Sequence, residues 1–154
     1  MSTKTRTVLT AGVLAVALGL GATAQASAGA PRSVGGDPSD NLTRIADFYG
    51  AYIDAESDPD GSGDLRTALR AYYIAPTYLK QLQAWEDREH ADGVLRAQNT
   101  PLKWKVTANG TAKNHTEAVI TLTWSRDTTT KLFVDMSRGS HKIIHIGTKG
   151  LGGK

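Results

Sequence analysis

The spacing of apolar residues changes once along the chain. Between residues 42 and 92 apolar residues recur every three or four positions, which is the period of an amphipathic α-helix. From residue 102 to residue 146 they recur at every second position, which is the period of a β-strand with one buried face. The pattern therefore predicts helices in the first half of the chain and a sheet in the second half.

Three helices are expected from the residues that favour helix ends. The first covers residues 42–55 and follows Asp40, whose carboxylate can cap a helix N-terminus. The second covers residues 62–73, cap included. The third begins at Pro76, because proline is tolerated in a first helical turn, and it ends near Gly93. The predicted apolar faces are Leu42, Ile45, Ala46, Phe48, Tyr49, Tyr52 and Ile53; then Leu65, Ala68, Leu69, Tyr72 and Tyr73; and finally Leu79, Leu82 and Trp85.

Four strands are expected in the second half of the chain. The first covers residues 102–108 and is followed by Asn109-Gly110, a pair that favours tight hairpin turns. The others cover residues 117–124, 132–136 and 142–146, with short polar or glycine-containing turns between them. Strands joined by such short turns form an antiparallel meander.

Helices followed by an antiparallel meander predict an α+β fold, with three N-terminal helices packed on one face of a curved four-stranded antiparallel sheet. The pattern places a single domain at residues 41–147. Residues 29–40 contain almost nothing to bury and are expected to form a flexible lead-in, and residues 148–154 a flexible tail.

The first 28 residues have the three-part layout of a secretory signal peptide. Lys4 and Arg6 precede an apolar run over residues 8–22, and a stretch of small residues ends in Ala26-Ser27-Ala28. A membrane anchor would need about 20 predominantly apolar residues, and this run is shorter. We therefore expect cleavage after Ala28, a secreted product and no membrane span in the mature chain.

The composition limits how the fold can be stabilised and which kinds of partner the chain can bind. The chain has no cysteine, so no disulfide can support the fold outside the cytoplasm. Removal of Lys4 and Arg6 from the 18 basic residues leaves 16 against 15 acidic residues, so the mature chain is nearly neutral. Nucleic-acid binding is therefore not expected. The charge is nevertheless divided, since residues 37–64 are mainly acidic and residues 96–154 mainly basic.

Five short segments resemble the nuclear transport factor 2-like, or cystatin-like, cone folds, and most closely a family of secreted bacterial domains of unknown function within that group. They are residues 48–52 (FYGAY), 74–79 (IAPTYL), 97–99 (AQN), 132–136 (LFVDM) and 139–146 (GSHKIIHI). His141 stands where such families commonly have a tryptophan. The resemblance implies a cone-shaped fold with a potential pocket between helices and sheet. It implies no particular reaction, because binding proteins and enzymes share this fold.

The acidic stretch at residues 56–64, ESDPDGSGD, partly matches a calcium-binding loop. Glu56, Asp58 and Asp60 occupy the first three ligand positions, and Gly61 occupies the turn position. The twelfth position holds Thr67 in place of the bidentate glutamate that makes such loops tight. The stretch is thus a weak candidate for calcium, and its other interpretation is a solvated connection between two helices.

Other common catalytic and metal patterns are incomplete. His141 and His145 are four residues apart, which on a strand separates them by about 13 Å, too far for a shared zinc ion. His90 and His115 are expected to be isolated and exposed. No G-x-S-x-G sequence is present. Asp135 is the best candidate for a pocket carboxylate, but the alternation places it on the outer face of its strand.

The tyrosines near helix ends are the remaining binding candidates. Tyr49, Tyr52, Tyr73 and Tyr78 could line a pocket with their hydroxyl groups, although most aromatic residues of so small a domain belong to its core. We expect a non-catalytic exported domain, without a cofactor, that binds a protein, an envelope component or a small ligand. The alternatives are a cone-fold lyase or isomerase with a pocket carboxylate, and a weak calcium-binding module.

Overall fold

A computed structural model describes residues 33–58 and 63–151 of the chain. The predicted signal peptide, Asp60 of the acidic stretch and the last three residues of the predicted tail lie outside the described residues. Within the described part, no helix is both long enough and apolar enough to cross a bilayer. All helices and strands of this part belong to one compact unit, which begins at Val34.

Three helices come first, as the apolar spacing predicts. They are α1 (Asn41–Glu56), α2 (Gly63–Tyr73) and α3 (Pro76–Glu89). Asp40 is the N-cap of α1, and its carboxylate accepts a 2.8 Å hydrogen bond from the backbone N–H of Thr43. Pro76 lies in the first turn of α3, where its missing N–H costs no helical hydrogen bond.

The end of α3 differs from the prediction. The helix stops at Glu89, and His90 adopts a left-handed conformation with φ 52° while its backbone N–H donates to the Glu86 carbonyl. Gly93 therefore does not close the helix, as we expected, but lies in the following loop. A side chain at this position would meet Leu82, with a Cβ only 2.7 Å from its Cγ. The glycine is needed for close packing of the loop against α3.

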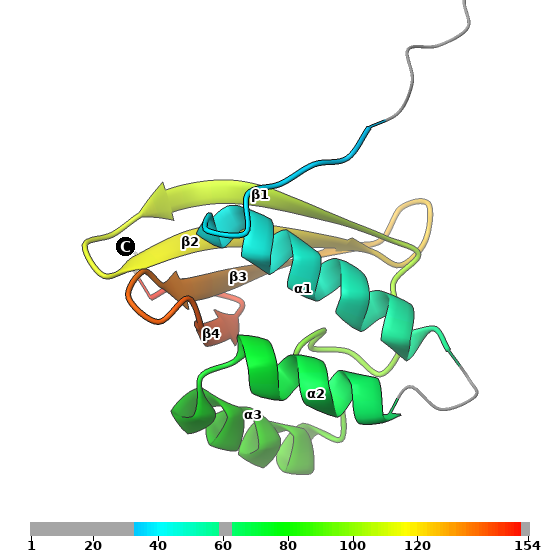
Figure 1. Ribbon diagram of the computed structural model, residues 1–154. Coiled ribbons are helices and arrows are strands. Elements are labelled where there is room, and N and C mark those ends of the chain that lie inside the picture. Colours follow the sequence, from blue (N-terminus) through cyan, green and yellow to red (C-terminus); the bar gives the residue numbers. More distant parts are fainter. Residues whose placement is uncertain (1–32, 59–62, 152–154) are drawn as a thin grey trace, which may run out of the picture. The chain divides into compact units, whose positions relative to one another are not determined.

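Four antiparallel strands follow in the order β1-β2-β3-β4 (Figure 1). They are β1 (Lys103–Thr111), β2 (His115–Thr123), β3 (Thr129–Ser137) and β4 (Ile143–Gly147). Each strand pairs with the next in the chain, which is a meander. The predicted α+β fold class is confirmed.

The first hairpin turn is displaced from its predicted place. Asn109 and Gly110 do not turn the chain but continue β1, where the pairing with β2 shifts register between Ala108 and Gly110. Gly110 has φ 151°, and a bulge of this kind increases the local strand twist. The chain reverses instead at residues 112–114, where the Ala112 N–H donates to the His115 carbonyl. The turn prediction at Asn109-Gly110 is therefore wrong.

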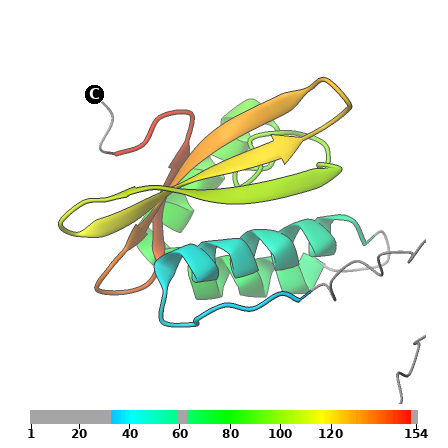
Figure 2. The ribbon, with the colours of Figure 1, turned by 90° about the horizontal axis from the view of Figure 1, so that it is seen from above.

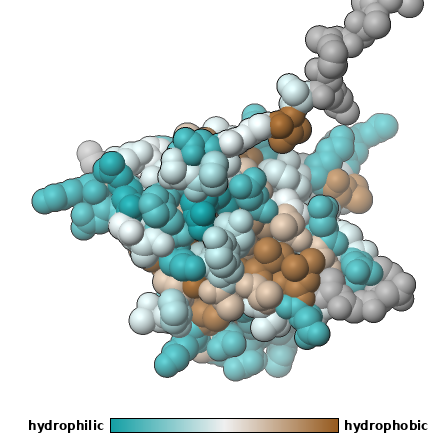
Figure 3. All heavy atoms as spheres, viewed as in Figure 1, coloured by the Kyte–Doolittle hydropathy of each residue, from teal (hydrophilic) through white to brown (hydrophobic). Residues whose placement is uncertain are grey.

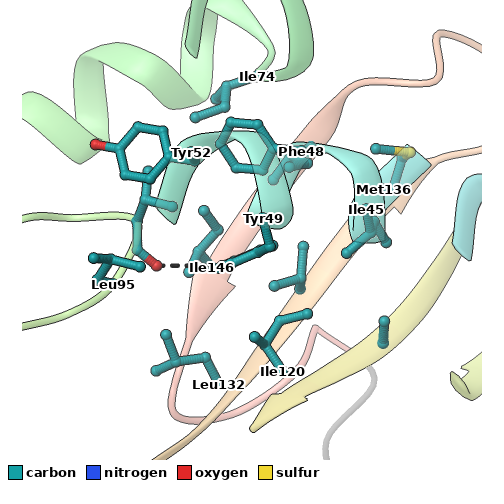
Figure 4. Close-up of a cluster of buried hydrophobic side chains, with 14 of the residues drawn as sticks. Ile45, Phe48, Tyr49, Tyr52, Ile74, Leu95, Ile120, Leu132, Met136 and Ile146 are labelled. Carbon is teal, nitrogen blue, oxygen red and sulfur yellow. Dashed lines mark hydrogen bonds between the residues drawn. The ribbon is translucent and has the colours of Figure 1, made fainter. Parts of the chain in front are cut away.

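The core lies between α1 and one face of the sheet (Figures 2 and 4). Ile45, Phe48 and Tyr49 of α1 are completely buried, as are Ile120 of β2 and Leu132 of β3. Because side chains alternate along a strand, Glu117 of β2 and Asp135 of β3 point to the opposite face of the sheet. The buried apolar residues are Ile45, Phe48, Tyr49, Tyr52, Ile53, Ile74, Tyr78, Leu82, Val94, Leu95, Ala118, Ile120, Leu122, Leu132, Val134, Met136, Ile143 and Ile146.

Helix α2 is less buried than its apolar spacing predicts. None of its residues is fully buried, and only Leu69 and Tyr73 pack against the core. Leu65 and Tyr72 remain about half exposed, at 51% and 57%. The prediction that Leu65, Ala68 and Tyr72 belong to a buried face is thus wrong, because α2 packs mainly against α1 and leaves these side chains exposed. Figure 3 accordingly shows apolar surface in the region of α1 and α2.

Candidate functional site

A solvent-open hollow lies where α3 meets β4 and the residues after that strand. Two adjoining cavities, of about 450 and 400 Å³, share four lining residues there. We call the combined hollow the α3–β4 cleft. Its lining consists of Tyr78, Gln81, Ala84, Trp85 and Arg88 from α3, Arg96 from the loop after α3, and His145, Ile146, Gly147, Thr148 and Lys149 from β4 and the segment beyond it.

Arg96 forms the centre of the cleft wall. Its guanidinium lies over the Trp85 ring, with Cζ 4.0 Å from the ring centroid. Its Nη2 donates to the Ile146 carbonyl at 2.6 Å and contacts the Tyr78 hydroxyl at 3.3 Å. The ring and the carbonyl hold the charge in one place, and the ring also excludes water from one face of the guanidinium. Arg96 is therefore a cation that the fold has already positioned.

The Tyr78 hydroxyl connects α3 to β4 beneath this arginine. It accepts a 2.7 Å hydrogen bond from the Ile146 N–H and donates a 2.8 Å hydrogen bond to the Ile146 carbonyl. Tyr78 is almost completely buried, so these bonds are shielded from water. The two walls of the cleft are thus fixed relative to each other.

The cleft carries positive charge without an internal counter-ion. Within residues 33–58 and 63–151, Arg88, Arg96 and Lys149 form no ion pair with a carboxylate. No described residue that lines the cleft is acidic. Arg88 donates only to a carbonyl of its own helix, that of Ala84 at 2.9 Å. An anion is the ligand that such an arrangement attracts.

His145 brings a second chemical group into the cleft. Its Nδ1 lies 3.0 Å from Oδ2 of Asp135, which is opposite it on β3 and completely buried. The backbone N–H of Leu151 donates to the same oxygen at 3.1 Å. Asp135 thus faces away from α1, as expected, yet it is shielded from solvent. The Asp135 carboxylate contacts Nδ1 of His145 and so orients the ring, but Asp135 itself does not line the cleft.

His115 lies on the other side of the same carboxylate. Its Nε2 is 3.3 Å from Asp135 Oδ1, a contact of opposite charges when the ring is protonated. The contact lacks hydrogen-bond geometry, since Oδ1 has no hydrogen-bond partner among the described residues. The expectation of an isolated, exposed His115 is wrong, because its side chain is only 16% exposed and touches Asp135. The two-residue period of β2 and β3 brings both side chains to one face.

Comparisons with known proteins found a solved structure with a similar fold but no matching family. No family model matches the chain, and no curated protein matches it either. One solved structure is similar: a protein of unknown function from Bacteroides thetaiotaomicron, with a TM-score of 0.57 and 17% sequence identity. The match covers 69% of this chain and 87% of that one. At this identity the similarity shows a shared fold alone.

A second, wider depression of about 720 Å³ lies beside α2, α3 and the loop after α3. Asp92 lines it and accepts a 2.5 Å hydrogen bond from the Tyr52 hydroxyl. Burial is the main cause that raises the pKa of the Asp92 carboxyl above its usual 3.8. Burial, followed by the charge of Asp92, likewise raises the pKa of Tyr52 well above its usual range.

The charged groups around Asp92 largely neutralise one another. Arg66 pairs with Glu56 at 2.5 Å, and Arg70 pairs with Glu86 at 2.7 Å. Both pairs line the same depression. Because its cations already have partners, this depression has less attraction for a charged ligand than the α3–β4 cleft.

The four tyrosines chosen from the sequence do not line one common pocket. The Tyr49 hydroxyl donates to the Val94 carbonyl at 3.2 Å inside the core (Figure 4). Tyr52 contacts Asp92, and Tyr73 packs edgewise or tilted against other rings at the surface of the core. Only Tyr78 among them lines the α3–β4 cleft.

The acidic stretch offers little to a metal ion in its described part. The Glu56 carboxylate is engaged by Arg66. Asp58 is exposed and follows the end of α1, whereas Asp60 lies outside the described residues. Among residues 33–58 and 63–151, no three His, Asp or Glu side chains are arranged to hold a metal. Calcium binding by Glu56, Asp58 and Asp60 remains a prediction.

Sequence patterns do not reveal the residues that define the cleft. The helical spacing assigns Trp85 only to the apolar face of its helix, and nothing in the spacing distinguishes Arg88, Arg96 and Lys149 from the other basic residues. They come from a helix, a loop and the segment after the last strand, so no local spacing connects them. The clustering of basic residues after position 96 is the one available signal.

Proposed function

We propose that the protein is an exported, non-catalytic domain that binds a small organic anion in the α3–β4 cleft. The observation that carries this proposal is a set of three cations, Arg88, Arg96 and Lys149, without a carboxylate partner in the described chain and gathered beside Trp85. Like charges that line one hollow repel one another, and an anion bound there would relieve that repulsion.

The size of the cleft supports a small ligand. A hollow of about 400–450 Å³ lies within the range of small-molecule sites. The nearly neutral net charge of the mature chain does not favour a nucleic acid as the ligand. Nη2 of Arg96 already donates to Ile146 and Tyr78 and its Nε is buried, so Nη1 is the nitrogen left to donate to an acid group such as a carboxylate or phosphate.

Export and the cone-fold assignment belong to the same proposal. The three-part pattern of residues 1–28 supports cleavage after Ala28 and secretion. The resemblance of five segments to nuclear transport factor 2-like or cystatin-like domains supports a cone fold, and helices that cover one face of an antiparallel sheet agree with it. The resemblance implies a pocket between helices and sheet, and the α3–β4 cleft lies between a helix and the edge strand of the sheet.

The proposal is tested by removing the two exposed cations of the cleft. We expect citrate, used as a trial polycarboxylate, to bind the mature protein in calorimetric titrations, and the double variant Arg88→Gln, Lys149→Gln to bind about tenfold more weakly. Each exposed charge contributes only modestly, so both are replaced. Raising the ionic strength should weaken binding to the unmodified protein.

The matched control replaces two basic residues away from the cleft. Lys103→Gln with Lys105→Gln removes the same charge from β1, where both side chains are exposed. Citrate binding should be nearly unchanged in this variant. Equal weakening in both double variants would mean that net charge alone attracts citrate, and the proposal would then be wrong.

One alternative is favoured by a separate observation. A lyase or isomerase needs a carboxyl group that exchanges a proton near neutral pH, and the buried pair of Tyr52 and Asp92 provides a carboxyl with a raised pKa beside a depression. If citrate binds in this depression, Asp92→Asn should change its affinity while Arg88→Gln, Lys149→Gln leaves it unchanged. The same set of titrations therefore separates the two sites.

A further inference from the structure

We infer that the ligand of the α3–β4 cleft carries a hydroxyl group close to its acid group, so that it is a hydroxylated organic anion. The inference rests on the proposed function and adds a second recognition element to it. That element is the Nε2 atom of His145, which the fold presents as a hydrogen-bond acceptor among cations.

The tautomer of His145 follows from its contact with Asp135. A carboxylate accepts hydrogen bonds and does not donate them, so the His145 nitrogen at 3.0 Å, Nδ1, carries a proton. In the neutral ring the other nitrogen, Nε2, then has a lone pair and no proton. Asp135 is completely buried and also receives the Leu151 N–H, so this arrangement is firmly held.

Nε2 is available to a ligand. His145 lines both parts of the cleft and its side chain is 25% exposed. Nε2 accepts no hydrogen bond from residues 33–58 or 63–151. Space beside it depends on Gly147, because a Cβ at that position would stand 2.9 Å from Nε2 and 3.0 Å from Cε1. The glycine keeps the acceptor open.

The residues around the His145 ring determine which functional groups the ligand must carry. Asp135 and His115 lie behind the ring, on β3 and β2, while Arg96 and Lys149 line the cleft with it. The two cations bind an acid group. A lone-pair acceptor beside them repels a second anionic oxygen but accepts a hydrogen bond from a hydroxyl. A hydroxyl near the acid group satisfies both requirements at once.

The test compares anions that differ only by a hydroxyl group. Citrate and tricarballylate have the same three carboxylates, and only citrate has the hydroxyl. At about pH 8, where an ordinary imidazole is neutral, we expect citrate to bind about three to ten times more tightly in calorimetric titrations. Propane-1,2-diol 1-phosphate and propyl phosphate, which differ by one hydroxyl group, form a second pair, which shows whether the acid group is a phosphate or a carboxylate.

Two variants locate the preference at His145. His145→Gln removes the acceptor in its fixed orientation. Gly147→Ala keeps the His145 and Asp135 side chains but places a methyl group against Nε2, so that the ring or the backbone has to shift. Both should lose the preference for citrate over tricarballylate, whatever their affinity for tricarballylate itself. Thermal melts of both variants show whether the fold is retained, and the second variant keeps every charged group in place.

The outcomes separate this inference from the proposed function. A preference for the hydroxylated member of a pair that disappears in the variants supports the inference. Equal binding of both members, or a preference that persists in Gly147→Ala, overturns it while anion binding in the cleft stands. Failure of all four anions to bind overturns the proposed function and the inference together.

Discussion

Replacement of Phe48 by alanine is expected to lower the free energy of unfolding by about 3–5 kcal/mol. Phe48 of α1 is completely buried. Its ring lies 5.4 Å from that of Tyr49, 5.5 Å from that of Tyr52 and 5.3 Å from that of Tyr73, measured between centroids. The substitution removes the centre of this aromatic group and leaves a cavity that the surrounding rings cannot fill.

Urea denaturation measures this loss directly, with Leu65→Ala as the control. Leu65 is 51% exposed on α2, so its truncation should change the free energy of unfolding by less than about 0.5 kcal/mol. Similar effects of the two substitutions would show that Phe48 is not the centre of the core. The citrate affinity of folded Phe48→Ala should be unchanged, because its ring does not line the cleft.

Replacement of Arg96 by methionine is expected to weaken citrate binding by at least about thirtyfold. Arg96 is the cation of the cleft whose position is fixed, by the Trp85 ring at 4.0 Å and the Ile146 carbonyl at 2.6 Å. Methionine preserves much of the apolar stem that packs on the tryptophan but has neither charge nor donors. Loss of a held, partly desolvated charge costs more affinity than loss of the exposed Arg88 or Lys149.

Calorimetric titration of Arg96→Met against Arg126→Met tests this expectation. Arg126 lies in the exposed turn between β2 and β3, so its replacement removes the same charge without touching the cleft. The control should bind citrate within about twofold of the unmodified protein. The explanation would fail if Arg96→Met, still folded by circular dichroism, bound citrate as tightly as the control.

Elements could be predicted from the sequence where local patterns decide them. The three-and-four spacing of Ile45, Tyr49 and Tyr52 reports the buried face of α1, since each of these residues contacts the sheet or its neighbouring loop. The alternation of Leu132, Val134 and Met136 likewise reports the inner face of β3. In both elements a single face is buried, so periodicity and burial coincide.

Predictions failed where tertiary contacts override local preference. Asn109-Gly110 favours a turn, yet pairing with β2 continues past it and a bulge absorbs the extra residue. Gly93 is a plausible helix end, yet packing of Leu82 requires a glycine there for a different reason. Leu65 and Tyr72 have helical spacing, yet α2 contacts other helices and leaves them exposed.

The candidate site could not be predicted from local patterns. Asp135 and His145 are ten residues apart, and they meet only because β3 and β4 pair with Asp135 opposite His145. Arg96 reaches Trp85 because the loop after α3 turns back on its helix, with Arg96 itself in a left-handed conformation at φ 54°. Register and loop path depend on the whole fold, and the sequence pattern predicts neither to the accuracy that a site needs.

The most direct test of anion binding in the α3–β4 cleft is a titration of the mature, ¹⁵N-labelled protein with citrate, followed by NMR at the tryptophan indole N–H groups. The chain has three tryptophans, and only Trp85 lines the cleft. Trp104 lies beside α1, and the Trp124 indole donates to Thr130. We predict a saturable shift of the Trp85 signal that is absent in Arg96→Met. A shift confined to Trp104 or Trp124, or no shift at saturating citrate, would contradict anion binding in the cleft.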